Sequence, residues 1–484
     1  MLLRNAAFNL VGLGAPLLVA AATIPALLAA LGTERFGFLA LMWALVSYFG
    51  LFDLGLGRAV THQLASRYAD PKPDAGVGEV LGTALVLMTG IGVVTGALMA
   101  LGAERALHYM GRLPDSAEAA RAIYWMAVAM PAIVATSGLR GALEARQAFG
   151  IVNAIRVPMG LFTYLGPMLV VWWVGPRLDW IAAVLSFGRI VACLVHAWFV
   201  LERPYGVQRL RWSRHAVRPM LQTGGWMSVS NIVGPLMGNA DRFIIAALLS
   251  ATAVTYYAVP HELVSKLWVV PGALTAVLFP AFVVQASRGS DGGGKLFRQA
   301  VRGMVLAMLP VTAAIALFAP ELLHAWLGAE MARNCAPLLQ LFALGVFLNG
   351  VATIPYTLLQ GAGHSRTTAL VHCFELPVFM GLMWWLTQTH GVLGAAIAWL
   401  LRMVFDTGAM FFFAPRALPG SAEGRWTAGD AAWIIAALLA FAACALPHLA
   451  PRVVVCLALV GWAAAMANRQ WRLIRQAPSA GGSR

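Results

Sequence analysis

Charged residues are scarce in this chain. Of its 484 residues, 60% are hydrophobic and only 11% are charged. Soluble domains usually carry about 25% charged residues, so the composition excludes a set of ordinary soluble domains. A membrane-spanning helix uses about 20 apolar residues. The apolar runs therefore predict a polytopic membrane protein and leave no room for a soluble catalytic domain.

Cysteine is also scarce. The five cysteines stand at positions 193, 335, 373, 444 and 456, four of them within apolar runs, and no CxxC or metal-ligand spacing occurs. Disulfide frameworks and zinc sites need such spacing. The sequence therefore predicts neither kind of site, and it indicates no bound cofactor or metal.

Apolar windows predict an all-α protein with about fourteen transmembrane helices. The first run is about 24 residues long, longer than the apolar core of a signal peptide, and another follows at once, so we expect it to be a retained span. The fourteen predicted spans are 8–31, 36–57, 80–103, 122–139, 157–175, 180–201, 222–249, 254–285, 303–320, 336–360, 368–389, 392–413, 431–449 and 452–468.

The basic residues predict which side each loop faces. With both termini inside, the inner segments hold 21 of the 34 Lys and Arg residues and the outer loops hold seven. Cytoplasmic loops are enriched in Lys and Arg, so this distribution predicts that both termini face the cytoplasm. The net charge of +14 is then mostly a property of the cytoplasmic face, and a nucleic-acid partner is not indicated.

An internal repeat indicates two similar halves. Residues 182–191 align with 395–404, which places Arg189 on Arg402, and residues 28–40 overlay 246–258 at a similar offset. Such repeats are typical of transporters with a substrate path between the halves. We therefore predict a six-helix N-lobe at 1–201, a basic cytoplasmic loop at 202–221, a six-helix C-lobe at 222–413, and two further helices with a tail at 414–484.

Three segments resemble Wzx-type polysaccharide flippases. The first opens at Asn9 and ends in the DLGLGR stretch, Asp53 to Arg58; the second is GNADRFIIAALLSATAVTYYAVP, Gly238 to Pro260; the third runs from His324 to Arg366. The resemblance extends over roughly residues 5–413 and also fits the superfamily that holds multidrug extruders and lipid II flippases.

This resemblance implies two six-helix lobes that form a V, two added helices, and a polyprenyl-diphosphate-linked oligosaccharide turned across the bacterial inner membrane for O-antigen or polysaccharide assembly. Association with a polysaccharide polymerase is a further expectation. The sequence departs from the family pattern at Thr255, where Gly is expected, which puts the tightness of that turn in doubt. The first span also has no Lys or Arg, which weakens the lipid II alternative.

Cations within the spans are the candidate substrate ligands, because a diphosphate inside a membrane needs fixed positive charge. We favour Arg189 and Arg402, with Lys266 and Arg242 as further candidates. Each has a structural alternative: Arg242 adjoins Asp241, Lys266 follows Glu262 by one helical turn, and Asp406 follows Arg402 by one turn. Arg156 and Arg302 lie near inner span ends, where long side chains reach water.

Carboxylates within the spans are candidates for coupling transport to H⁺ or Na⁺. Glu262, Glu375 and Asp406 lie in predicted spans, and Asp53 belongs to the DLGLGR stretch. Structural pairing is the alternative, with His261 or Lys266 for Glu262, His372 for Glu375 and Arg402 for Asp406.

Two other functions compete with flipping. An ion-coupled exporter of drugs or small metabolites would prefer an acidic or aromatic cavity. A membrane glycan polymerase or glycosyltransferase usually needs a large outer loop, and the longest predicted here, 104–121, has eighteen residues. We therefore predict a carrier and not an enzyme; a purely structural membrane protein would not need buried charges at repeat-equivalent positions.

Overall fold

The computed structural model describes residues 2–48, 56–68, 76–109, 116–201, 210–288, 293–417, 437, 439, 441–445 and 448–476. Every regular element within these ranges is a helix, and ten helical runs are long and apolar enough to cross a membrane. The prediction of an all-α, polytopic membrane protein is confirmed. The side of the membrane on which the termini lie stays a prediction.

The long helices follow the predicted spans. Two of them, α1 and α13, each bend at a glycine with positive φ, Gly32 and Gly391, and so contain two predicted spans. Most of the thirteenth predicted span lies outside the described residues. The main helices are α1 (Leu2–Tyr48), α3 (Val77–Tyr109), α4 (Ser116–Ala145), α5 (Phe149–Trp173), α6 (Leu178–Leu201), α7 (Arg214–Leu248), α8 (Ala251–Ser265), α9 (Val269–Arg288), α10 (Gly293–Leu317), α12 (Ala329–Gly361), α13 (Ser365–Phe413) and α15 (Leu449–Gln476).

The turns support the internal repeat. The bend at Gly32 corresponds to the break at Ser250 between α7 and α8, at the predicted offset of 218. Gly175, between α5 and α6, and Gly391 lie 216 positions apart, and both have positive φ. Glycine adopts this conformation without the steric cost that a side chain would add. The two halves therefore place their turns at matching positions.

Two short helices were not expected. Helix α2 (Leu56–Tyr68) lies in a predicted inner loop, and α11 (Ala319–Leu327) lies in a predicted outer loop. Helix α2 contains Arg, His and Gln among its apolar residues, so a search for continuous apolar runs misses it. Nine residues, as in α11, are too few to span a membrane.

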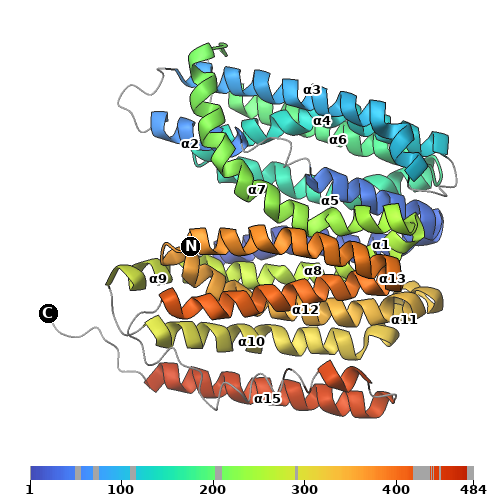
Figure 1. Cartoon of the computed structure of the whole chain (residues 1–484), viewed down its shortest axis with the longest axis vertical. Helices are drawn as coiled ribbons and strands as arrows, with labels where there is room; N and C mark the ends of the chain where they lie inside the picture. The colour runs from blue at the N-terminus through green and yellow to red at the C-terminus, as the bar shows by residue number, and fades with distance from the viewer. Residues whose placement is uncertain are drawn as a thin grey trace. The chain divides into compact units, whose positions relative to one another are not determined.

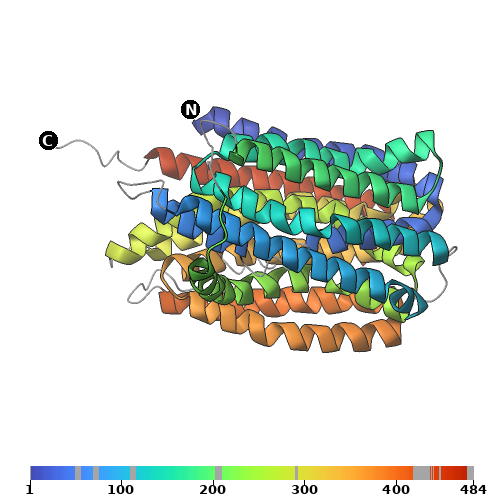
Figure 2. The same ribbon diagram turned by 90° about the horizontal axis from the view of Figure 1, so that it is seen from above.

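The chain divides into two compact units, Met1–Ala258 and Val259–Arg484. The predicted lobes follow the repeat and stay predictions, whereas this division follows packing: α7 packs on α1, α2 and α3 and so belongs to the first unit. Within that unit, α4 lies between α3 and α6, and α5 packs on α1 and α6 (Figures 1 and 2). In the second unit, α12 packs against α9, α10, α11 and α13.

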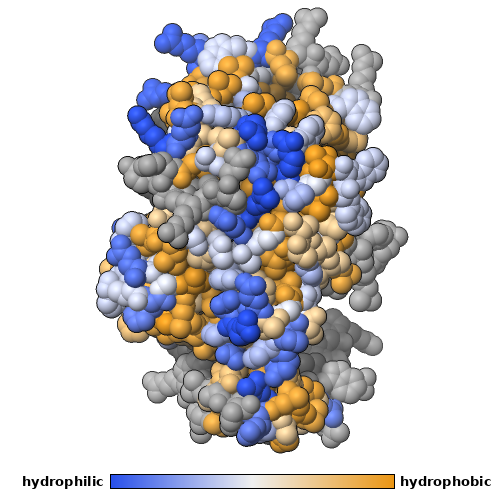
Figure 3. Space-filling view, turned by 90° about the vertical axis from the view of Figure 1, so that its right-hand side faces the viewer, coloured by the Kyte–Doolittle hydropathy of each residue, from blue (hydrophilic) through white to orange (hydrophobic). Residues whose placement is uncertain are grey.

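Large apolar side chains are exposed on both units. Trp172, Trp173, Trp384 and Trp385 are among them. Aromatic residues of this kind gather at membrane interfaces. The helix ends at the right of Figure 1 carry hydrophilic residues among hydrophobic ones (Figure 3). Both features fit a protein whose sides contact lipid.

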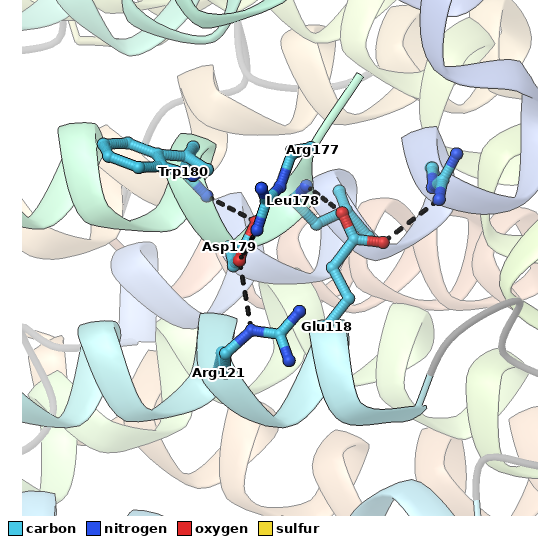
Figure 4. Close-up of polar contacts among 7 residues, drawn as sticks. Glu118, Arg121, Arg177, Leu178, Asp179 and Trp180 are labelled. Carbon is cyan, nitrogen blue, oxygen red and sulfur yellow. Dashed lines mark hydrogen bonds and ion pairs between the residues drawn. The ribbon is translucent and has the colours of Figure 1, made fainter. Parts of the chain in front are cut away.

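A network of ion pairs joins the bend of α1 to the N-terminal ends of α4 and α6 (Figure 4). Glu118 accepts a hydrogen bond from the backbone N–H of Leu178, 2.6 Å away, and pairs with Arg35 at 3.1 Å. Asp179 pairs with Arg121 at 3.1 Å and with Arg177 at 2.8 Å. Both carboxylates lie at a helix N-terminus, where the helix dipole favours negative charge. The network therefore fixes how these helix ends meet.

Candidate functional site

The first unit contains a cavity of about 400 Å³ among α4, α5 and α6, with Val46 of α1 also in its wall. This volume lies within the range of about 300–1,000 Å³ that is common for ligand sites. Its walls combine apolar side chains with positively charged ones. The charged and titratable residues of the lining are Arg140, Arg156, Arg189 and His196.

Of the charged residues that line the cavity, Arg189 lies nearest the middle of its helix. It is close to the middle of α6 (Leu178–Leu201), and a rise of about 1.5 Å per residue places it roughly 17 Å from either end. Among the described residues, none forms a hydrogen bond or ion pair with it. Arg189 also borders a second, much smaller hollow, together with Met126, Leu185 and Ser186. Arg189 therefore borders both hollows, and its N–H groups are available to donate hydrogen bonds to a ligand.

No carboxylate lines the cavity among the residues that the structure describes. The nearest ion pair on its wall joins Arg140 to Glu144, 3.5 Å apart on the same helix, and both side chains are partly exposed. Nδ1 of the buried His196 lies 2.7 Å from the carbonyl oxygen of Ala192. Because a carbonyl only accepts, Nδ1 must carry the proton. The cavity is therefore cationic and rich in donors.

The sequence predicts part of this site. Arg189 is a predicted substrate ligand, whereas Arg140 falls in a predicted inner loop and His196 is not among the predicted ligands. One signal was available: His196 follows Arg189 by seven residues, so the two lie on one face of a helix. Arg156, which was expected to reach the inner interface, is exposed and also lines the cavity.

Arg242 is held in a polar network of the first unit. Its side chain is buried and donates to the carbonyl oxygen of Ala40, 3.5 Å away. The adjacent Asp241 accepts a 2.6 Å hydrogen bond from the hydroxyl of Tyr257. Thr255, where the family pattern predicts Gly, donates a hydrogen bond to the carbonyl oxygen of Thr33. The threonine therefore ties α8 to the bend of α1, and only residues 249 and 250 separate α7 from α8.

Lys266 and Glu262 form an ion pair, as their spacing of one turn allows. Lys266 begins a short 3₁₀ segment, Lys266–Trp268, between α8 and α9. His261, next to Glu262, is buried and contacts the rings of Phe342 and Trp399 edge to face. This arrangement corresponds to the structural alternative for Lys266.

The charges of α13 pair differently from the expected pattern. Arg402 donates from Nε to Oε1 of Glu375, 2.7 Å away, and Nε2 of His372 lies 3.4 Å from Oδ1 of Asp406. Along one straight helix, Arg402 would have paired with Asp406, and His372 with Glu375. The bend at Gly391 folds the helix back on itself, so each basic group meets the acid on the opposite half. The expected pairs are therefore exchanged.

The remaining candidates lie elsewhere. Arg302 is half-buried on α10. Asp53 falls outside the described residues. Arg189 and Arg402, which the repeat makes equivalent, thus have different surroundings: a cavity without acids in one unit and an ion pair in the other. Of the candidate cations, Arg189 is the one that the structure leaves best placed to bind an anion.

A bundle of long apolar helices with a duplicated half and a charged internal cavity defines a membrane transporter. The chain belongs to the polysaccharide biosynthesis protein family, whose model matches residues 29–333. It is 30% identical over 409 residues to a Shigella flexneri protein named "Putative O-antigen transporter". The aligned region covers 84% of this chain and 96% of that relative.

Solved structures share the fold. The lipid II flippase MurJ, in an inward closed conformation, matches with a TM-score of 0.73 and 10% identity over 95% of this chain and 98% of its own. An inward-facing multidrug resistance MATE family transporter of the MOP superfamily matches with a TM-score of 0.67 and 16% identity, over 82% and 93% of the two chains. These relatives are named as transporters or flippases, in agreement with the prediction that the chain is not an enzyme.

Proposed function

We propose that this protein flips a polyprenyl-diphosphate-linked oligosaccharide across the bacterial inner membrane by alternating access, for the assembly of O-antigen or another polysaccharide. The cationic cavity of the first unit carries the proposal. A diphosphate head carries negative charge through a layer where unpaired charge is very costly. Arginine forks match phosphate oxygens and stay charged at any physiological pH.

The family supports the substrate class. A relative covering most of the chain is named for O-antigen transport, and the matched family is named for polysaccharide biosynthesis. Hydroxyl groups of Thr136 and Thr163 also line the cavity, where they can accept hydrogen bonds from sugar hydroxyls. Association with a polysaccharide polymerase is part of the proposal, because the flipped glycan must be consumed on the outer side.

The competing exporter function is less well supported. A carrier for cationic drugs needs acidic or aromatic groups in its cavity, and the lining residues here are basic, hydroxylic and aliphatic. Its fold resembles a multidrug transporter, but a fold does not determine the substrate.

A deletion strain tests the proposed function. Cells that make the glycan but lack this protein should accumulate lipid-linked glycan on the cytoplasmic leaflet, and the intact gene should clear it. If the deletion strain accumulates none and instead becomes sensitive to cationic drugs, the exporter function is correct and flipping is wrong.

A further inference from the structure

The bend in α13 brings four charged or titratable side chains together in the second unit. His372 and Glu375 precede Gly391, and Arg402 and Asp406 follow it. Residues three or four apart share one face of a helix, so each half presents one acid and one base. The contacts at 2.7 Å and 3.4 Å run between the halves, not along them.

The two acids of this cluster are buried. Glu375 is 3% exposed and Asp406 is 8% exposed. Oε2 of Glu375 makes no hydrogen bond among the described residues, and Oδ1 of Asp406 makes none either, although Nε2 of His372 lies 3.4 Å from it. Buried carboxylate oxygens are normally hydrogen-bonded, so each of these atoms has unused capacity to accept a proton or a hydrogen bond.

The charges of the cluster do not balance when His372 is neutral. Glu375 and Asp406 carry two negative charges, and Arg402 supplies one positive charge. An excess negative charge between two apolar helices is costly. One proton on the pair formed by His372 and Asp406 would balance the cluster.

We propose that His372, Glu375 and Asp406 form a proton-binding site, with the proton shared between Nε2 of His372 and the carboxylates that face it. A hard metal cation is less suited to this donor set, because such cations prefer six or more oxygen ligands and the guanidinium of Arg402 repels them. A proton, in contrast, can be held by the imidazole and the carboxylates alone.

Few other titratable or charged groups surround the cluster among the described residues. From α12, the ring of Tyr356 stacks on His372 with centroids 5.9 Å apart. From the 3₁₀ segment Ala414–Ala417, Arg416 lies over Phe412 and Phe413. The other titratable groups of α13 are exposed: Arg366, Cys373 and His390. The two buried acids are thus separated from these exposed groups, and the His372 side chain of the cluster is 29% exposed.

The proton would control how the two halves of α13 are held together. With the proton bound, a pair of His372 with Asp406 adds to the pair of Arg402 with Glu375. After the proton leaves, Asp406 keeps a buried charge without a cationic partner, which favours separation of the halves or entry of water. If the chain flips glycan as proposed, this exchange can drive the transport cycle, but proton binding itself does not depend on the substrate.

Infrared difference spectroscopy tests the site without any glycan. The full chain is reconstituted in lipid and perfused with sodium-free buffers of alternating pH. We expect reversible bands of a protonated carboxyl or imidazolium group, and we expect Asp406→Asn, Glu375→Gln and His372→Gln each to alter the same bands. The matched controls are Glu104→Gln and His390→Gln, which change exposed residues and should leave those bands in place.

Two results would overturn the proposal. One is a set of difference spectra in which all three cluster variants match the wild-type protein. The other is the appearance, on adding sodium at constant pH, of carboxylate bands that Asp406→Asn removes, since that would make the cluster a metal-cation site. Because each variant probes the site separately, misfolding of one leaves the test intact, and none of these readouts depends on whether the protein flips glycan.

Discussion

The sequence alignment of the two repeats places Arg189 on Arg402, yet of these two residues only Arg402 has a carboxylate partner among the described residues. Arg402 lies 2.7 Å from Glu375, whereas Arg189 borders a cavity that has no acid in its described lining. The two aligned cations, both partly exposed, therefore have different surroundings. We infer that Arg189 serves substrate binding and that Arg402 serves structure.

The first prediction concerns Arg189. Arg189→Ala should leave the amount of folded protein unchanged, because the substitution strands no described partner. A hydrogen bond to a charged group contributes about 1.5–3 kcal/mol, so glycan export in a complementation assay should fall by about tenfold to a hundredfold. The control is Arg333→Ala, at an exposed position of α12. Wild-type export by the Arg189 variant would refute a role in substrate binding.

The second prediction concerns the pair of Arg402 and Glu375, whose side chains are 14% and 3% exposed. Arg402→Gln leaves the Glu375 carboxylate buried without its partner, and breaking such a pair costs about 3–5 kcal/mol. The melting temperature in detergent should fall clearly. The double variant, which adds Glu375→Gln, should recover much of the loss. If the double variant is no more stable than Arg402→Gln, the two residues are not energetically coupled.

The third prediction concerns the ion-pair network that joins the bend of α1 to the N-terminal ends of α4 and α6. Glu118→Ala removes the acceptor of the Leu178 N–H, and an unsatisfied buried donor costs about 1–3 kcal/mol. Thermal stability should fall by a corresponding amount. Glu104→Ala, at an exposed position of α3, should have little effect. Equal stability of the two variants would show that the network does not stabilise the helix ends.

The fourth prediction concerns Gly37. A β-carbon at this position would collide with the carbonyl group of Ala251, which is backbone and cannot move aside alone. Gly37→Ala should therefore lower stability, although alanine normally favours a helix over glycine by about 1 kcal/mol. Gly102→Ala meets no atom within 4 Å and should be neutral or stabilising. Comparing the unfolding of both variants checks this close approach, and equal tolerance would contradict it.

Most of the fold could be predicted from the sequence, because long apolar runs in a membrane leave few alternatives to a helix. The alignment of residues 28–40 with 246–258 also matched the turns at Gly32 and Ser250. Helix α2 was missed because it lies along the polar loop between two spans and has no continuous apolar run. Its helical form depends on packing against α4 and α7, which its own residues do not encode.

The site was only partly predictable. Spacing along a helix correctly paired Lys266 with Glu262, because both lie within two adjoining turns. The same rule failed for Arg402, because its partner stands on the other side of a bend. The cavity at Arg189 also depends on the meeting of four helices, α1, α4, α5 and α6, and Arg140 falls in a predicted loop until that packing is known. The partner of Arg402 and the cavity at Arg189 both depend on tertiary structure, which spacing along one helix does not give.

The most direct test of the proposed function uses the purified full chain in vesicles that contain a polyprenyl-diphosphate-linked disaccharide. A glycosidase that cannot cross the membrane is added outside, and the cleaved fraction is measured over time. We expect the wild-type protein to make the inner-leaflet substrate accessible to the enzyme, and Arg189→Ala to slow this markedly. In protein-free vesicles only the outer-leaflet substrate is cleaved. If vesicles that contain the folded and inserted protein give the same cleaved fraction, the flippase account is contradicted.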